Sequence, residues 1–89
     1  MAETELLIRN QLGLHVRAAA KFVHTASKFK CEVLVSRDGL EVNGKSILGV
    51  MMLAAEMGST IVVKTVGADE QEALTAIRAL VDGKFEGEP

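Results

Sequence analysis

The chain has 89 residues, 48% of them hydrophobic and only one a proline, which indicates a single folded domain rather than disorder. A formal net charge of −2 and the lack of Trp and Tyr exclude the basic face and stacking aromatics of nucleic-acid binders. The lone Cys31 excludes an internal disulfide and a cysteine-based metal site, and we interpret it as a small buried residue.

The rest of the sequence leads to expectations about the cellular compartment and about cofactors. The segment over residues 1–5, which carries Glu3 and Glu5 and is acidic overall, is not followed by the apolar core of a signal peptide. No apolar run reaches the roughly 18 uncharged residues that a membrane span needs. With two histidines and one cysteine in the chain, we expect no metal and no cofactor. We therefore expect a cytoplasmic protein with no nucleic-acid partner and no membrane insertion.

The first predicted elements are a strand over residues 4–9 and a loop over residues 10–14. A helix then follows over about 16–28, because apolar residues recur there at the spacing of one helix face. The residues on that face are Val16, Ala19, Ala20, Val23 and Ala26. His24 lies on the same helix, and we interpret it as an exposed bystander.

His15 falls at the N-cap of this helix, and Gly13 before it permits a tight turn or a close backbone approach. Histidine is unusual at this position, where Ser, Thr, Asp and Asn are preferred. An imidazole here faces free backbone N–H groups and the positive end of the helix dipole, a site that favours an anion. Arg17 adds a guanidinium suited to a phosphoryl group. The combination predicts a nucleophilic histidine, and the alternative is a surface histidine that merely precedes a helix.

The middle of the chain predicts a hairpin and a second helix. Strands over residues 31–36 and 40–43 flank Asp38-Gly39, a strong two-residue hairpin signal. Asn43-Gly44 makes a further turn, and Ser46 is the natural N-cap of a helix from Ile47 to about Met57, with Gly58 at its end. The start of this helix is apolar on every face, so we interpret it as a partly exposed docking surface. The alternative is a helix that only fills the core.

The last third predicts a fourth strand over residues 60–66 and a third helix. Asp69 and Glu72 form a capping box at the helix start, and Gly83 ends it. Its apolar stripe comprises Ala73, Leu74, Ile77, Leu80 and Val81. We expect residues 84–89 to be a frayed tail. The order β-α-β-β-α-β-α predicts an α+β fold, a four-stranded antiparallel sheet covered on one face by three helices, as one domain over residues 1–89.

Two segments resemble those of a known family. Gly13-Leu14-His15-Val16-Arg17 resembles the active-site signature of HPr, the histidine-containing phosphocarrier of the bacterial phosphotransferase system. Lys45-Ser46-Ile47-Leu48-Gly49-Val50-Met51 resembles that family's regulatory serine region. Length, motif positions and element order also match, so the resemblance covers essentially the whole chain. It implies the open-faced β-sandwich that the family adopts.

The resemblance implies that His15 accepts a phosphoryl group from phospho-enzyme I and passes it to enzyme IIA domains. Nδ1 would be the acceptor atom and Arg17 would stabilise the phosphoryl group. The anion would also meet the backbone N–H groups of Val16, Arg17 and Ala18. The implied partner-docking residues are Ala20, Ile47, Leu48 and Met51. Such a carrier is a monomeric protein substrate rather than a self-sufficient enzyme, and no nucleotide-binding loop or catalytic carboxylate pair is present.

Ser46 has two possible roles, one structural and one regulatory. Its structural role as a helix cap is sufficient to explain it. A phosphate there would meet a helix N-terminus, and its charge would lie beside the docking surface and repel acidic partners. The resemblance implies an HPr kinase/phosphorylase as the enzyme that modifies it.

Three positions depart from the family pattern, and they leave open which branch of the phosphotransferase system the protein would serve. Ala18 stands where many relatives carry Pro, Leu12 where many carry Ser or Asn, and Val16 where a small residue is common. These changes affect the expected transfer rate and partner choice more than the reaction type. The open alternatives are a nitrogen-branch or purely regulatory HPr-like protein, and a small-ligand-binding α+β module.

Overall fold

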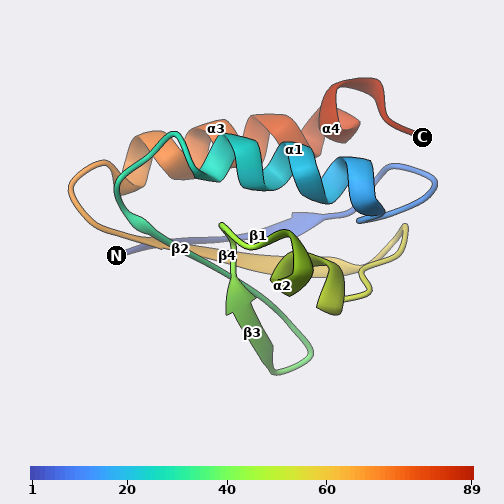
Figure 1. Ribbon diagram of the computed structural model, residues 1–89, viewed down its shortest axis with the longest axis horizontal. Helices are drawn as coiled ribbons and strands as arrows, with labels where there is room; N and C mark the ends of the chain where they lie inside the picture. The colour runs from blue at the N-terminus through green and yellow to red at the C-terminus, as the bar shows by residue number, and fades with distance from the viewer.

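The computed structural model describes all 89 residues and places a layer of helices against a four-stranded antiparallel sheet (Figure 1). The predicted order of strands and helices is confirmed, with one short extra element, α4, at the end. The elements are β1 (Ala2–Leu7), α1 (Val16–Ala26), β2 (Glu32–Arg37), β3 (Leu40–Asn43), α2 (Ile47–Met52), β4 (Thr60–Val66), α3 (Glu70–Asp82) and α4 (Lys84–Gly87). None of the helices combines the length and apolarity needed to cross a bilayer.

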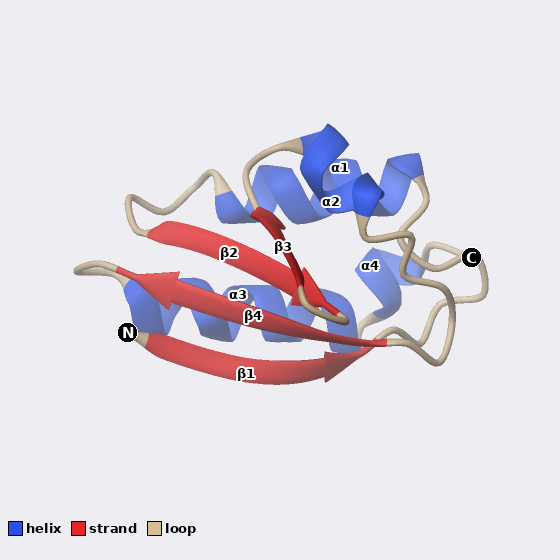
Figure 2. Cartoon of the chain, turned by 90° about the horizontal axis from the view of Figure 1, so that it is seen from below, coloured by secondary structure: helices blue, strands red, loops and turns tan.

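The strands lie in the order β1-β4-β2-β3, with every neighbouring pair antiparallel. Alternate residues of the two central strands face the helices and are buried. They are Val33 and Val35 on β2, and Ile61, Val63 and Thr65 on β4. The opposite face of the sheet has no helical cover (Figure 2). The predicted Asp38-Gly39 hairpin is confirmed, since both residues have positive φ and Arg37 pairs with Leu40.

Helix α1 is rotated relative to the predicted face. Its buried residues are Ala18, Ala19, Phe22 and Ala26, whereas Val16 and Ala20 are exposed. Phe22 and Phe85 are the two largest fully buried side chains of the domain. The helix therefore turns its aromatic residue toward the sheet, and the small residues one turn before and after it complete the contact.

Helix α2 is shorter than predicted. It ends at Met52, with Leu53 as C-cap, and Gly58 lies beyond it in the turn that leads to β4. The helix stops where Ala54 adopts a left-handed φ of 49°. Arg37 of β2 donates from Nη1 to the carbonyl oxygens of Leu53 and Ala54, at 3.2 and 2.8 Å. This tertiary contact, which places a cation at a helix C-terminus, ends α2 in place of the predicted glycine.

Asp69 does not form the predicted capping box. Its side chain makes no hydrogen bond to the start of α3. Its carboxylate instead accepts from the backbone N–H groups of Lys30 and Cys31, at 2.8 and 2.9 Å. These bonds, led by that from Lys30, hold the pKa of Asp69 below its ordinary range. Cys31 is buried as predicted, and its burial raises the pKa of the thiol.

The C-terminal segment, residues 84–89, lies against the domain instead of forming the expected frayed tail. Lys84, Phe85 and Glu86 have left-handed φ values of 56°, 54° and 62°, so α4 is a left-handed turn. Phe85 is fully buried and Glu88 is 6% exposed. Left-handed backbone costs about 1–2 kcal/mol per residue for L-amino acids, so the burial of Phe85 and the contacts of Glu88 must offset that strain.

Candidate functional site

The loop that leads to His15 is fixed by three close contacts. Gly13 has a φ of +65°, and a Cβ on it would collide with the carbonyl oxygen of Ala55. Leu14 N–H donates to that same carbonyl at 2.8 Å. The buried Asn10 side chain donates from Nδ2 to Gly13 O at 2.6 Å. The loop therefore holds His15 next to the segment that follows α2.

His15 occupies the N-cap of α1, as predicted, with extended backbone angles (φ −70°, ψ 175°) and no capping hydrogen bond from its side chain. The first hydrogen bond of the helix runs from Ala19 N–H to His15 O, at 2.8 Å. The N–H groups of Val16, Arg17 and Ala18 therefore precede the helical ladder, and such groups attract anions. The imidazole is 19% exposed.

Two cationic side chains extend from the first turns of α1 beside this histidine. Arg17 and Lys21 are four residues apart, so they lie on one helix face. Both contact a single carboxylate oxygen, Glu88 Oε2: Arg17 Nη2 at 3.2 Å and Lys21 Nζ at 2.8 Å. Lys21 also donates to the carbonyl oxygen of Phe85 at 3.1 Å. The two cations thus bind the C-terminal segment to the helix that carries His15.

The Glu88 carboxylate is ionised in this environment. Donation from Lys21, together with the charges of Arg17 and Lys21, holds the pKa of Glu88 below its ordinary value, although burial acts in the opposite direction. Conversely, the hydrogen bond to Glu88 raises the pKa of Lys21. Glu88 therefore remains negative, and Lys21 positive, at neutral pH.

Two buried polar atoms beside these ion pairs have no hydrogen-bond partner. They are His15 Nε2 and Glu88 Oε1, which lie 3.9 Å apart, beyond hydrogen-bond distance. Buried polar atoms are normally paired, and exceptions concentrate at sites that do chemistry. The ring nitrogen that faces the C-terminal segment is therefore Nε2.

Ser46 caps α2 as predicted. Its Oγ accepts a hydrogen bond from Gly49 N–H at 3.1 Å. The hydroxyl is half-buried, and α2 packs against α1, which begins at His15. A charge added at Ser46 would therefore lie on the helix next to the one that carries the histidine.

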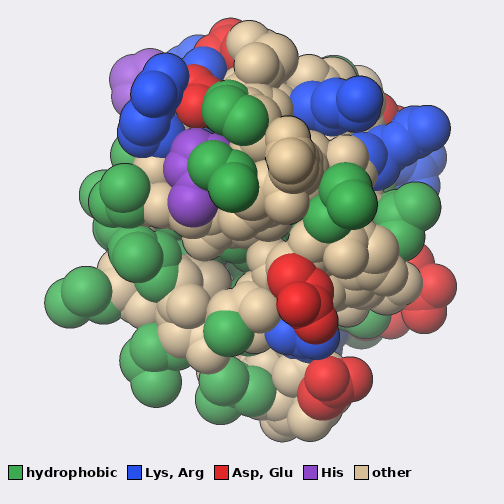
Figure 3. Space-filling model, turned by 90° about the vertical axis from the view of Figure 1, so that its right-hand side faces the viewer, with side chains coloured by type: hydrophobic (Ala, Val, Ile, Leu, Met, Phe, Trp, Pro, Cys, Tyr) green, Lys and Arg blue, Asp and Glu red, His purple; other side chains and the backbone are tan.

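Apolar side chains gather beside a histidine on the face of the molecule drawn in Figure 3. The predicted docking residues are among them: Leu48 is 77% exposed, Ile47 40% and Met51 38%. Ala20 is exposed as well. We call this surface the α2 patch, and it also includes Leu12, Val16 and Met52, all of them more than half exposed. Figure 3 shows hydrophobic side chains beside a histidine, with Lys and Arg side chains along the upper edge.

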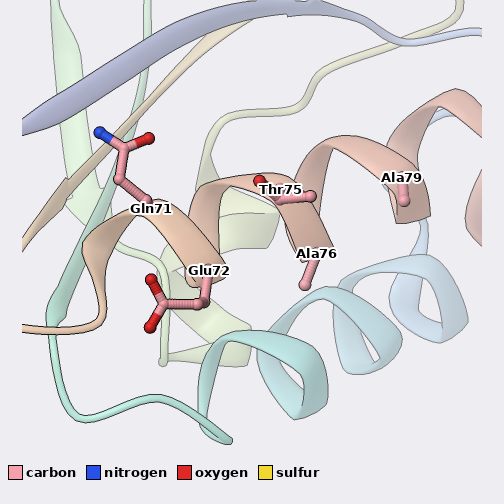
Figure 4. A pocket seen from close by; sticks show the side chains of 5 residues that line it. All are labelled: Gln71, Glu72, Thr75, Ala76 and Ala79. Carbon is pink, nitrogen blue, oxygen red and sulfur yellow. The ribbon is translucent and has the colours of Figure 1, made fainter.

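The surface hollows of the molecule lie elsewhere. One follows the outer surface of α3 and is lined by Gln71, Glu72, Thr75, Ala76 and Ala79 (Figure 4). None of the four hollows includes His15 or Arg17. No cluster of His, Cys, Asp and Glu side chains is suited to hold a metal ion. His15 thus lies outside these hollows.

Sequence reasoning missed several residues of this site. Lys21 could have been found, because it lies four residues after Arg17 on one helix face. Arg37 and Glu88 act through contacts distant in sequence, and Glu88 lies 71 residues from Arg17. Asn10 contacts both Gly13, three residues away, and Pro89, 79 residues away. No local pattern marks such partners.

Comparison with known proteins identifies the family. A protein-family model described as the PTS HPr component phosphorylation site matches residues 2–82. The chain belongs to the HPr family. Phosphocarrier protein HPr of Neisseria meningitidis serogroup A is 53% identical over 89 residues, 99% of this chain and 100% of the relative. A crystal structure of HPr-C-His from Thermoanaerobacter tengcongensis has a TM-score of 0.95 at 43% identity, over 100% of both chains.

The HPr fold expected from the sequence is thereby confirmed, as is membership of a phosphocarrier family of the phosphotransferase system. A crystal structure of an HPr dimer, also from Thermoanaerobacter tengcongensis, has a TM-score of 0.77 at 44% identity. It covers 96% of this chain and 98% of that one. The C-terminal segment with Glu88 lies beyond the residues that the family model matches.

Proposed function

We propose that this HPr-family protein is a phosphocarrier that accepts a phosphoryl group on His15 from phospho-enzyme I and passes it to enzyme IIA domains. The observation that carries the proposal is the place of His15 at the N-terminus of α1, beside Arg17 and without a capping bond of its own. Free N–H groups and a guanidinium there favour the phosphoryl charge that arrives. In each transfer the bond between phosphorus and the donor breaks, and a bond between phosphorus and an imidazole nitrogen forms.

The acceptor atom we propose is Nδ1. Nε2 is buried and faces the Glu88 carboxylate at 3.9 Å, which leaves Nδ1 as the other ring nitrogen. The N–H groups of Val16, Arg17 and Ala18 at the helix start would then bind the phosphoryl oxygens. The chain needs no cofactor for this step, because the donor supplies the phosphoryl group and the protein supplies only position and charge.

Phosphotransfer with phosphoenolpyruvate and purified enzyme I, read by intact mass, tests the proposal. We expect an acid-labile gain of one phosphoryl group in the wild-type protein and in His24→Gln, because His24 is exposed and outside the site. His15→Ala should show no gain. Phosphorylation of His15→Ala to the wild-type level would overturn the assignment. Comparing phosphotransfer from a sugar-branch enzyme I with phosphotransfer from a nitrogen-branch enzyme I shows which branch of the phosphotransferase system this carrier serves.

We further propose that phosphorylation of Ser46, by an HPr kinase/phosphorylase, slows this transfer. A phosphate at the start of α2 would add charge beside the α2 patch without requiring a new fold. Ser46→Asp retains a good N-cap residue, so stability should change little while transfer from phospho-enzyme I slows. Ser46→Asn, a neutral cap of similar size, is the matched control. Equal rates for both variants would contradict the regulatory role.

The proposed carrier acts as a monomer in the cytoplasm. Its exposed α2 patch is then available to each partner in turn, and methionine there can adapt to different surfaces. Light scattering during size-exclusion chromatography measures the mass in solution. A dimer that covers the patch would contradict the monomeric proposal.

A further inference from the structure

The C-terminal segment reaches the site from the far end of the sequence. Pro89 O accepts hydrogen bonds from Asn10 Nδ2 and Leu12 N–H, both at 3.1 Å. These contacts join the segment to the loop that leads to His15. In Figure 1 the C-terminus lies beyond the end of α3, on the side where α1 begins. Residues 84–89 are thus docked onto the reactive end of the molecule.

The Glu88 carboxylate binds the two cations that lie beside His15. It is 6% exposed, contacts Arg17 and Lys21 through Oε2, and has its other oxygen 3.9 Å from the imidazole. Arg17 is 73% exposed, so its guanidinium can turn toward another anion nearby. A phosphoryl group on His15 carries the same sign of charge as Glu88 and prefers the same cations. The two anions therefore compete.

The docked segment is also strained, and this is independent of its charges. Three consecutive residues, Lys84 to Glu86, adopt left-handed backbone, which side chains other than glycine disfavour. Strain of this kind persists only where surrounding contacts enforce it. Loss of the Glu88 ion pairs would leave the buried Phe85 and the hydrogen bonds to Phe85 O and Pro89 O to enforce it.

We propose that Glu88 is an internal competitor of the phosphoryl group, holding Arg17 and Lys21 while His15 is unmodified and giving up Arg17 when His15 is phosphorylated. The C-terminal segment then undocks, because its strained turn loses the ion pair between Glu88 and Arg17 that helps to hold it. Glu88 is in this sense a positioning residue that lowers the affinity of the carrier for the phosphoryl group and favours its onward transfer. This inference rests on the proposed function of His15.

Undocking can be measured without any partner protein. Phosphoramidate phosphorylates imidazole nitrogens: its P–N bond breaks, a new P–N bond forms on histidine, and the histidine proton leaves with ammonia. In a His24→Gln background, His15 is the sole histidine. Backbone amide exchange is then followed at Gly87 and Glu88, which donate to Gly83 O and Lys84 O in the docked turn.

We expect these two amides to exchange faster after phosphorylation, while Ile77 in the core of α3 keeps its protection. Unchanged protection at Gly87 and Glu88 in the phosphorylated protein would overturn the proposal. His15→Ala treated in the same way controls for effects of the reagent.

Glu88→Gln tests the competition itself, because it removes the charge and keeps the size. At a fixed ratio of phosphoenolpyruvate to pyruvate, with enzyme I, the ratio of phosphorylated to free carrier should rise about two- to fivefold, the factor for removing one like charge at about 4–8 Å in water. The matched control is Glu86→Gln, because Glu86 is 71% exposed and also contacts Lys21. It should change that ratio by less than about twofold.

The outcomes separate this inference from the proposed function. A lower or unchanged ratio in Glu88→Gln would overturn the competition while the phosphocarrier function stands. Failure of enzyme I to phosphorylate the wild-type protein would overturn the proposed function. The phosphoramidate experiment would still decide whether Glu88 and a phosphoryl group exclude one another.

Discussion

At the scale of single residues, Gly13 and Gly39 both have positive φ but differ in their surroundings. Gly13 abuts the backbone of Ala55 and Glu56, whereas nothing lies within 4 Å of a Cβ on Gly39. The first glycine is required by both conformation and space, the second by conformation alone. Comparing the stability lost on substitution of each glycine therefore separates the cost of backbone strain from the cost of steric collision at the loop that carries His15.

We predict that Gly39→Ala lowers the free energy of unfolding by about 1 kcal/mol, the ordinary cost of alanine at positive φ. Gly13→Ala should cost clearly more than about 1 kcal/mol, since the added methyl must also displace the backbone after α2. Urea denaturation of both variants measures the difference. Equal losses would mean that the Gly13 loop moves freely away from Ala55.

The N-cap position of His15 could be predicted from local sequence because its signals lie within a few residues. Gly13, His15 and Arg17 stand together at the start of a helical pattern, and the structure places His15 at the N-cap. The opposite holds for Glu88, whose partners Arg17 and Lys21 lie on the first helix. Glutamate near a chain end is common, and only the folded chain shows what it contacts.

At the scale of elements, β4 and the β2–β3 hairpin could be predicted because alternation and a two-residue turn are local. The end of α2 and the role of Asp69 could not. Arg37 ends α2 from a neighbouring strand, and Asp69 binds the backbone that precedes β2. In each case a distant polar partner outweighs the local capping preference.

The exposed apolar surface of α2 leads to a prediction about partners. Leu48→Asp should weaken binding to enzyme I by about tenfold or more, because a charge replaces the most exposed large apolar side chain of the α2 patch. Stability should change by no more than about 0.5 kcal/mol, since Leu48 is 77% exposed. Isothermal titration with purified enzyme I measures the affinity.

The matched control for this surface is Leu40→Asp. Leu40 is 43% exposed on β3, next to the hairpin turn and outside the α2 patch. It should leave the affinity for enzyme I unchanged within about twofold, as expected of a position outside the contact. Equal weakening by both variants would indicate a general effect of added negative charge rather than docking on α2.

At the scale of the whole molecule, three segments that are distant in sequence meet at the surface around His15. The loop before α1, the end of α2 and the C-terminal segment converge there, through contacts of Leu14 with Ala55 and of Pro89 with Leu12. A change in the charge of this surface therefore acts on all three. The ion pair between Lys21 and Glu88 is where pH can make such a change.

The stability that Glu88 contributes should vanish in acid and in strong base. Its pKa is lowered on folding from an ordinary 4.5, so its contribution is complete above that value and is lost as pH falls through the lower, folded pKa. The pKa of Lys21 is raised from 10.5, so its share is complete below that value and is lost as pH rises through the higher, folded pKa. Urea denaturation of the wild-type protein and Glu88→Gln across this range should give a difference in unfolding free energy that is largest at neutral pH. A difference independent of pH would mean that the segment is held by the burial of Phe85 and its backbone hydrogen bonds, and that the carboxylate charge has no part in docking it.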